Sequence, residues 1–251
     1  MPTAPTPKDT AEQIRHELQI GGSAQHAAGV QRFFKEEIQS HGWYTAALRK
    51  AAVPTRKKIL REKSLDYLMK VADNLFRGDI LEEKVFAVFL LEKITGQLGN
   101  KEFRIFEKWL TRVSTWADHD ALASYLLGPM LVSEPKRSER VFVWAKDENR
   151  WRRRAAAVTL IRGARLELFE REIIQVSNLL LRDEDDMVQK GLGWLLREWT
   201  RDYPVRAVPF LMEIRDSAPR LVMRTACEKL SSAQRKKVLE PSVRRNRGPS
   251  L

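Results

Sequence analysis

The first candidate for chemistry in this sequence is a carboxylate one helical turn from a tryptophan. Trp116 and Asp120 stand at positions i and i+4, so a helix that begins here would present both side chains on one face. Ser114 or Thr115 could cap that helix, and Asp118 would favour its first turn electrostatically. Taken alone, Asp120 is more simply a first-turn acid and Trp116 the edge of a core, so the pair needs support from other features.

The second candidate is a run of arginines directly before an apolar helical stretch. Arg150, Arg152, Arg153 and Arg154 surround Trp151. Positive side chains at a helix N-terminus oppose the helix dipole, and such an arrangement is a good phosphate receptor. The alternative is that the preceding acids, at 147 and 148, neutralise the cluster.

The third candidate is a pair of glycines beside a tryptophan inside a helical stretch. Gly191 and Gly193 each cost a helix about 1 kcal/mol relative to alanine. They could permit close helix packing or clear space beside Trp194 for an approaching backbone. A buried Trp194 is an equally weighted alternative.

The elements that must position these residues are helices. Apolar residues recur every three or four positions, and no Asn-Gly or Asp-Gly hairpin signal occurs. Such stripes predict helices over 65–76, with a stop at Arg77-Gly78, over 103–113, and over 30–38, with an end near Gly42.

A weak internal repeat is present among these helices. Apolar helical segments start at 88, 124, 158 and 194, which are 36, 34 and 36 residues apart, and a fifth follows around Ala226. Helical hairpins at this period predict an all-α protein, an α-solenoid of degenerate HEAT-like hairpins. Such an array is curved, and its concave face can form a basic cleft for a long ligand.

Composition limits the function classes. The net charge is +12 and the pI about 9.9, which favours a nucleic-acid partner. One cysteine excludes an intramolecular disulfide framework, and four scattered histidines argue against a zinc site. No apolar run approaches the roughly 20 residues that cross a bilayer, and no signal peptide is evident. We therefore expect a cytoplasmic protein with no metal and no membrane association.

The ends of the chain differ from its middle. Residues 1–9 are rich in Pro and Thr, and we expect them to be disordered. The repeat domain is expected over 10–234. A basic tail at 235–251 follows, which is either simply solvated or a nonspecific phosphate-gripping arm.

Three segments together resemble the DNA alkylation repair family of AlkD-type DNA glycosylases. They are Trp116-x-x-x-Asp120, Trp151-x-x-Arg154-Ala155-Ala156 and the segment 189–198, within a match from about residue 25 to 230. The last segment is the most specific, and the match around 52–58 is looser.

The resemblance implies a concave surface that binds duplex DNA and an enzyme that excises cationic N3- and N7-alkylated purines without a metal or other cofactor. It implies that Asp120 assists hydrolysis, that Trp116 and Trp194 line the cleft at the lesion, and that Arg154 holds phosphate. It also implies activity without a base-flipping pocket. We expect further DNA contacts from Arg152, Arg153, Lys190, Arg197, Thr55 and Lys58.

The expected chemistry is simple. An alkylated purine is already cationic and leaves as a neutral base, so a carboxylate need only stabilise the oxocarbenium-like sugar and polarise a water. Nearby indole faces stabilise cationic character. No lysine nucleophile is indicated, so the product would be an abasic site.

Two alternatives to a monofunctional glycosylase remain. The first is a catalytically silent relative that binds damaged or branched DNA, and the second is a helical scaffold for a protein partner. The joint presence of Trp116, Asp120, Arg154 and Trp194 favours the enzyme, and the basic excess disfavours the scaffold. We expect the enzyme to act as a monomer, associated with the nucleoid of a bacterial-type cell.

Overall fold

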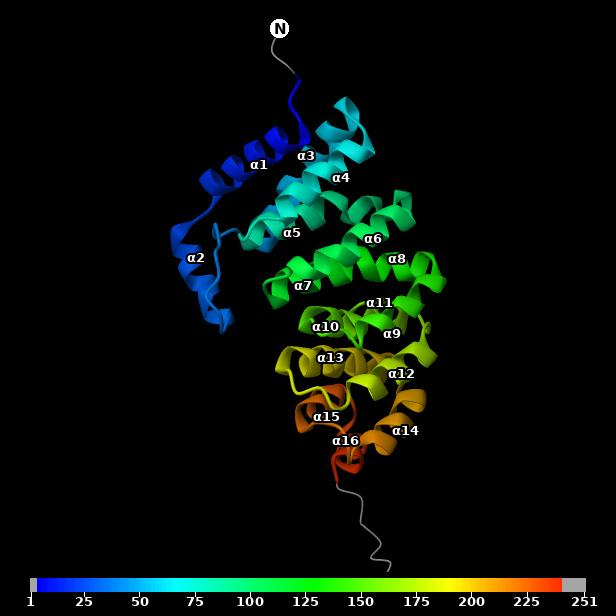
Figure 1. Ribbon diagram of the computed structural model, residues 1–251. Helices are drawn as coiled ribbons and strands as arrows, with labels where there is room; N and C mark the ends of the chain where they lie inside the picture. Colours follow the sequence, from blue (N-terminus) through cyan, green and yellow to red (C-terminus); the bar gives the residue numbers. More distant parts are fainter. Residues whose placement is uncertain (1–3, 241–251) are drawn as a thin grey trace, which may run out of the picture. The chain divides into compact units, whose positions relative to one another are not determined.

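The computed structural model describes residues 4–240, and over this range it is helical with no strand (Figure 1). One isolated bridge joins Gln39 to Ile80. The chain divides into two compact units, a first unit that ends at Arg137 and a second unit that begins at Ser138. The expected all-α helical-repeat class is confirmed.

The first unit contains eight α-helices within its described residues, together with short 3₁₀ turns and one π-helical segment, Ala123–Leu127. The helices are α1 (Pro7–Gly21), α2 (Ala24–Val30), α3 (Thr45–Glu62), α4 (Leu65–Phe76), α5 (Leu81–Leu91), α6 (Asn100–Trp109), α7 (Trp116–Leu122) and α8 (Gly128–Ser133).

The second unit, over its described residues, is built in the same way. Its helices are α9 (Arg140–Trp144), α10 (Arg150–Val158), α11 (Ile161–Ala164), α12 (Glu170–Leu180), α13 (Asp186–Asp202), α14 (Pro204–Ile214), α15 (Arg220–Ala226) and α16 (Ser232–Leu239).

One central helix organises the core of each unit. In the first unit, α5 is buried from Glu82 to Leu91 and packs against α3, α4 and α7. In the second unit, α13 packs against α10, α14 and α15. Each helix therefore buries its apolar face against near neighbours in the chain, which is the packing pattern of a helical repeat.

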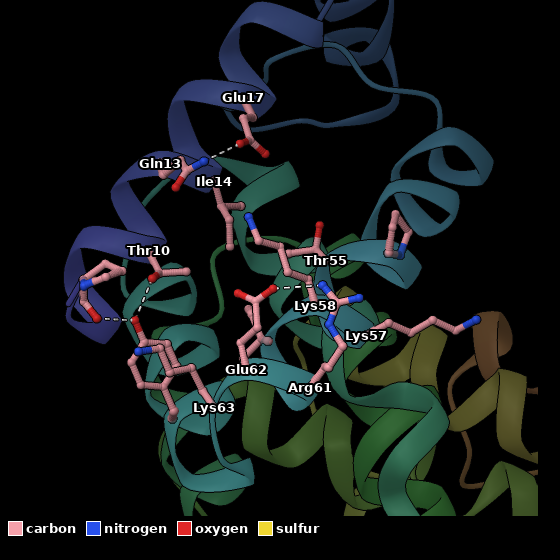
Figure 2. Close-up of a pocket in the computed structure, with 14 residues that line it drawn as sticks. Thr10, Gln13, Ile14, Glu17, Thr55, Lys57, Lys58, Arg61, Glu62 and Lys63 are labelled. Atoms are coloured by element: carbon pink, nitrogen blue, oxygen red, sulfur yellow. Dashed lines mark hydrogen bonds and ion pairs between the residues drawn. The ribbon is translucent and has the colours of Figure 1, made fainter.

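A cavity of about 730 Å³ lies between α1, α3 and the start of α4 (Figure 2). Its lining includes the apolar side chains of Ile14 and Ile59 and basic side chains from the C-terminal half of α3 and the residue after it. The basic side chains are Lys57, Lys58, Arg61 and Lys63.

The first turn of α5 buries two carboxylates, of which Glu82 holds a loop. Its carboxylate accepts hydrogen bonds from the backbone N–H groups of His41 (2.8 Å), Gly42 (2.9 Å) and Trp43 (3.2 Å), and from the hydroxyl of Ser40 (2.6 Å). Gly42 has φ +78°, a left-handed backbone that a side chain would strain. The loop before α3 is therefore tied to α5.

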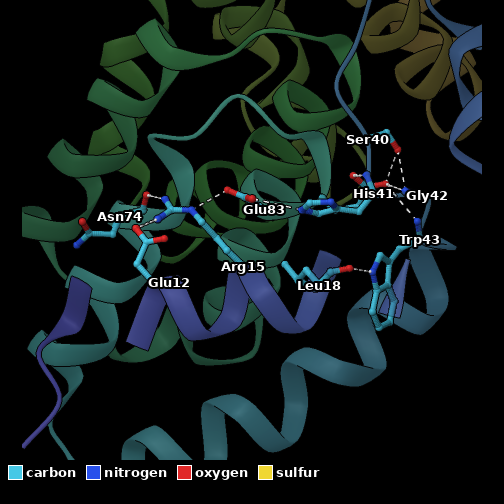
Figure 3. Close-up of polar contacts among 10 residues, drawn as sticks. Glu12, Arg15, Leu18, Ser40, His41, Gly42, Trp43, Asn74 and Glu83 are labelled. Carbon is cyan, nitrogen blue, oxygen red and sulfur yellow. Dashed lines mark hydrogen bonds and ion pairs between the residues drawn. The ribbon is translucent and has the colours of Figure 1, made fainter. Parts of the chain in front are cut away.

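Glu83 ties α1 to the same turn (Figure 3). Its carboxylate accepts from Arg15 Nε at 2.9 Å and contacts His41 Nε2 at 3.3 Å. Arg15 also donates to the backbone carbonyl of Asn74, which lies in the last turn of α4. One guanidinium therefore joins α1, α4 and α5.

Lys84 connects α5 to the start of α7. Its ammonium donates to the carbonyl of Arg112 at 2.6 Å and to the hydroxyl of Ser114, and it lies 3.6 Å from Asp118. Lys84 and Asp118 are both buried. Because a buried charge is costly without its counterion, this pair fixes where α7 begins.

Two of the three apolar stripes form helices as expected. The first becomes α4, which ends at Phe76 with Arg77 as its C-cap. The second becomes α6 and the 3₁₀ turn after it, with Phe103, Phe106, Leu110 and Val113 buried.

The prediction of a helix over 30–38 is wrong. Helix α2 ends at Val30, a 3₁₀ turn follows, and Phe33 is 75% exposed. The side chain of Gln31 donates to the carbonyl of Glu36 and accepts from the N–H of Ile38. These bonds satisfy the backbone locally and replace the helical ladder.

The expected boundaries at both ends also shift. Helix α1 begins at Pro7, inside the segment expected to be disordered, because Thr6 and Asp9 form a capping box around a first-turn proline. At the other end, Arg235–Leu239 belong to α16. Glu240 is the C-cap of this helix. Residues 241–251 of the expected basic tail, and residues 1–3, lie outside the described residues.

We predict that Lys84→Met lowers the free energy of unfolding by about 3 kcal/mol, because Asp118 would be left buried without its cation. Urea denaturation measures this change. Lys70→Met is the matched control, since Lys70 pairs with Asp66 on the surface, where its side chain is 63% exposed. Equal losses in the two variants would contradict the role of the buried pair.

Candidate active site

Helix α7 begins with the predicted Trp116. Thr115 is its N-cap, and Asp118 accepts from the backbone N–H of Thr115 at 2.7 Å and of Ser114 at 3.0 Å. Asp118 is therefore a capping residue held by α5. Trp116 is half-buried and stacks on Phe34, with ring centroids 5.0 Å apart.

Asp120 lies one turn further along α7, as the spacing predicts. Its side chain is 18% exposed, and its Oδ1 lies 2.7 Å from Nδ1 of His119, whose side chain is fully buried. The carboxylate is therefore held from inside and keeps a solvent-facing part. Sequence reasoning treated His119 only as one of four scattered histidines.

An arginine of α3 stacks on an aromatic ring in the segment that follows α7. The π-helical segment after α7 carries Tyr125, and Arg49 of α3 lies between Tyr125 and Phe89, 4.5 and 4.4 Å from the two ring centroids. Arg49 also lies 3.3 Å from Glu92. No sequence motif indicated this arginine, because its partners come from three separate elements.

The two candidate DNA-binding residues on α3, Thr55 and Lys58, differ in how their side chains could meet a phosphate. The hydroxyl of Thr55 donates to the carbonyl of Ala51 at 3.1 Å. Lys58 is exposed and lines the cavity beside α1, whereas Lys57 points away from α1 (Figure 2). Lys58 is the better placed of the two candidates to meet a phosphate.

In the second unit, the arginine run is capped and ion-paired. Asn149 caps α10 by accepting from the N–H groups of Trp151 and Arg152. Arg152 pairs with Asp147 at 2.8 Å, and Arg153 pairs with Asp183 at 2.6 Å. Asp147 therefore neutralises Arg152, as the alternative expected. Arg153 is neutralised by Asp183, which that alternative did not include, and it contacts Glu148 through the backbone carbonyl.

The pKa of Asp147 lies below its ordinary value. Burial raises this pKa, but the backbone N–H of Asn149 and the guanidinium of Arg152 lower it by more. Asp147 is therefore a stable anion beside the arginine run.

Arg154 is buried, with 5% of its surface exposed, and its Nη1 donates to the carbonyl of Met187 at 2.5 Å. Gly191 on α13 makes room for it, because a Cβ there would lie 3.0 Å from Cγ of Arg154. The guanidinium of Arg154 is thus anchored between α10 and α13.

Gly193 serves the opposite side of α13. A Cβ at this position would lie 2.9 Å from Cβ of Thr225 on α15, so the glycine permits close helix packing. Trp194 is half-buried and not a core residue. Of the readings left open for the two glycines, the structure supports close packing.

The remaining candidate cations on α13, Lys190 and Arg197, are partly exposed. Lys190 pairs with Asp186 at 3.0 Å and Arg197 with Glu228 at 2.9 Å. Trp116, Asp120, Thr55 and Lys58 belong to the first unit, whereas the α10 and α13 candidates belong to the second unit. The second set comprises Arg152, Arg153, Arg154, Lys190, Trp194 and Arg197.

Glu198 is structural. Its buried carboxylate contacts Arg165 (2.8 Å), Arg201 (2.7 Å) and Arg197 (3.4 Å). Burial raises the pKa of this carboxyl. The hydrogen bond and charge of Arg165, with the charges of Arg201 and Arg197, lower the pKa by more, so it lies below its ordinary value of 4.5.

The described residues offer no metal site, no membrane-spanning helix and no activated cysteine. Over residues 4–240, no group of three or more His, Cys, Asp or Glu side chains could hold a metal ion. Within the same residues, none of the helices combines the length and apolarity that a membrane span requires. Cys227 is buried, and burial raises the pKa of its thiol to about 11, so it is not an activated nucleophile.

The fold and these side chains define a class: a helical-repeat protein with a carboxylate–indole pair on α7 and arginine-rich helices beyond it. The chain belongs to the DNA alkylation repair enzyme family, whose model matches residues 14–230. Membership supports a role in DNA repair and hence binding to DNA.

Solved structures show the same fold. A predicted DNA alkylation repair enzyme from Enterococcus faecalis is 16% identical, with a TM-score of 0.76 over 84% of this chain and 97% of that one. AlkD2 from Streptococcus mutans is 19% identical, with a TM-score of 0.57 over 81% of this chain and 97% of that one. Comparison with curated proteins finds no match.

We predict that Glu198→Gln lowers the free energy of unfolding at pH 7 by about 2 kcal/mol, because charged hydrogen bonds to arginine are lost. The folded-state pKa is depressed, so this contribution is present above pH 4.5 and disappears as the pH falls through the lower folded value.

Urea denaturation at several pH values measures the gap between wild type and variant. Glu213→Gln, at an exposed position on α14, is the control and should show little change at any pH. A gap for Glu198→Gln that widens in acid would contradict the assignment.

Proposed function

We propose that this protein is a monofunctional DNA glycosylase that hydrolyses the N-glycosidic bond of cationic N3- or N7-alkylated purines in duplex DNA. The observation that carries this proposal is the Asp120 carboxylate, partly exposed, held by His119 and one turn from Trp116. Family membership gives the reaction class its context.

The proposed role of Asp120 follows from the charge of the reaction. An N-alkylated purine leaves as a neutral base, and positive charge develops on the sugar as the bond breaks. A nearby carboxylate stabilises that charge and polarises a water for attack on the sugar. Trp116, fixed by its stack on Phe34, offers an indole face to the same cationic centre.

We propose that Trp194 of the second unit contacts the same nucleotide. Its half-buried ring leaves part of the indole accessible, as a cleft-lining residue requires. The chain would then act as a monomer on one lesion, leave an abasic site, and use no metal or other cofactor.

The proposed DNA contacts are the basic side chains on α3, α10 and α13. Lys58, Arg152, Lys190 and Arg197 keep an exposed part, and counterion release would drive their binding to phosphates. We propose that Thr55 and Arg153 also contact DNA, although each has an internal partner.

Arg154 is proposed to bind phosphate in a more constrained way. Its guanidinium is anchored on Met187, so little rotamer freedom would be lost when a phosphate is bound. The neighbouring Arg152, which is less buried, would make the more exposed contact.

Base release from alkylated duplex DNA tests the proposed reaction. With a chelator present, wild type should release N7-methylguanine or N3-methyladenine under single-turnover conditions. Asp120→Asn, nearly isosteric but uncharged, should release base about 100-fold more slowly or worse, because the developing charge is no longer stabilised. Its affinity for DNA should be retained.

Asp66→Asn, on the surface of α4, is the control for the same change of residue type. Wild type that binds alkylated DNA but releases no base would favour the silent DNA-binding relative. Unchanged release by Asp120→Asn would remove this carboxylate from the mechanism.

The salt dependence of binding tests the proposed phosphate contacts. Lys58→Ala should weaken affinity similarly for all duplex sequences and reduce the slope of log K against log salt by about 0.9. Fluorescence anisotropy over a salt series gives both quantities. Lys108→Ala, at an exposed position on α6, is the control and should leave the slope unchanged. Equal slopes for the two variants would reject the assignment of Lys58.

A further inference from the structure

The side chains of His119 and Asp120, which are neighbours in α7, contact each other. Side chains at i and i+1 point about 100° apart and do not normally face each other. Here Nδ1 of His119 and Oδ1 of Asp120 are 2.7 Å apart. The contact therefore requires one side chain to bend toward the other, within α7.

Burial explains which side chain is fixed. His119 is completely buried, whereas Asp120 keeps 18% of its side chain exposed. The core of the first unit therefore immobilises the imidazole, and the imidazole in turn limits the rotation of the carboxylate. The backbone at this point is itself fixed, because Asp118 is tied to Thr115 and lies beside Lys84.

The chemistry of the pair specifies where the proton lies. Asp120 acts as a carboxylate in the proposed reaction, and an ionised carboxylate can only accept hydrogen bonds, so we infer that Nδ1 of His119 carries the proton of this short contact. The imidazole is thus a donor to Oδ1, and this bond orients the carboxylate plane. A carboxylate oriented from its buried side presents its exposed part in a defined direction.

We propose that His119 is a positioning residue for Asp120: its Nδ1–H holds the carboxylate in the orientation that assists glycosidic-bond hydrolysis. This inference rests on the proposed function, and it assigns to His119 no contact with DNA. Its contribution is geometric, because misplacing a reacting group by about 1 Å can reduce a rate by about 100-fold.

Two substitutions separate a positioning role from a purely structural one. His119→Leu fills the buried space but removes the donor, whereas His119→Asn retains a side-chain N–H near the position of Nδ1. We expect the single-turnover rate of base release to fall roughly 10- to 100-fold in His119→Leu. His119→Asn should recover most of the rate, and the DNA dissociation constant should stay unchanged in both.

Thermal unfolding identifies a variant that fails to fold. If His119→Leu fails to fold, the rate of His119→Asn and a ¹⁵N histidine spectrum of the wild-type protein test the positioning role instead. The spectrum should show His119 protonated at Nδ1, and this signal should shift in Asp120→Ala. An Nδ1 without a proton would overturn the proposal.

The outcomes also distinguish this inference from the proposed function. If wild type releases base, Asp120→Asn does not, and a folded His119→Leu matches wild type, then His119 has no positioning role and the glycosylase remains. If His119→Leu loses rate only through weaker DNA binding, the positioning role is likewise overturned. If wild type releases no base, both proposals fail together.

Discussion

The burial of three charged side chains in the first turn of α5 is the constraint on which the first unit depends. Glu82, Glu83 and Lys84 are each less than 5% exposed, so each must find partners within the protein. Those partners are a loop, helix α1 and the start of α7. Because these contacts fix where α7 begins, they also place Trp116 and Asp120, which lie in the first turns of that helix.

A steric constraint plays the corresponding part in the second unit. Helix α13 approaches α10 on one side and α15 on the other, and glycines stand at the points of closest approach. Gly191 admits the anchored Arg154, and Gly193 admits Thr225. The cost of two glycines in a helix is thus offset by packing that also fixes an arginine proposed to bind phosphate.

The helical class, the repeat and the Trp116–Asp120 helix could be predicted because spacing along the chain encodes them. The first-turn charges of α5 could not, since their partners are 28 to 68 residues away and leave no local pattern. His119 was missed because neighbouring helical residues are not expected to touch. The apolar stripe over 30–38, which includes Phe34, predicts a helix that is not there. The hydrogen bonds of Gln31 that replace the helical ladder have no recognisable spacing in the sequence.

The most direct test of the account is a crystal structure of Asp120→Asn bound to duplex DNA that contains one N7-alkylated guanine. The account predicts that Trp116, the substituted side chain at 120 and Trp194 all lie against the damaged nucleotide. A structure with the lesion bound elsewhere on the chain, or with Trp194 away from that nucleotide, would contradict it.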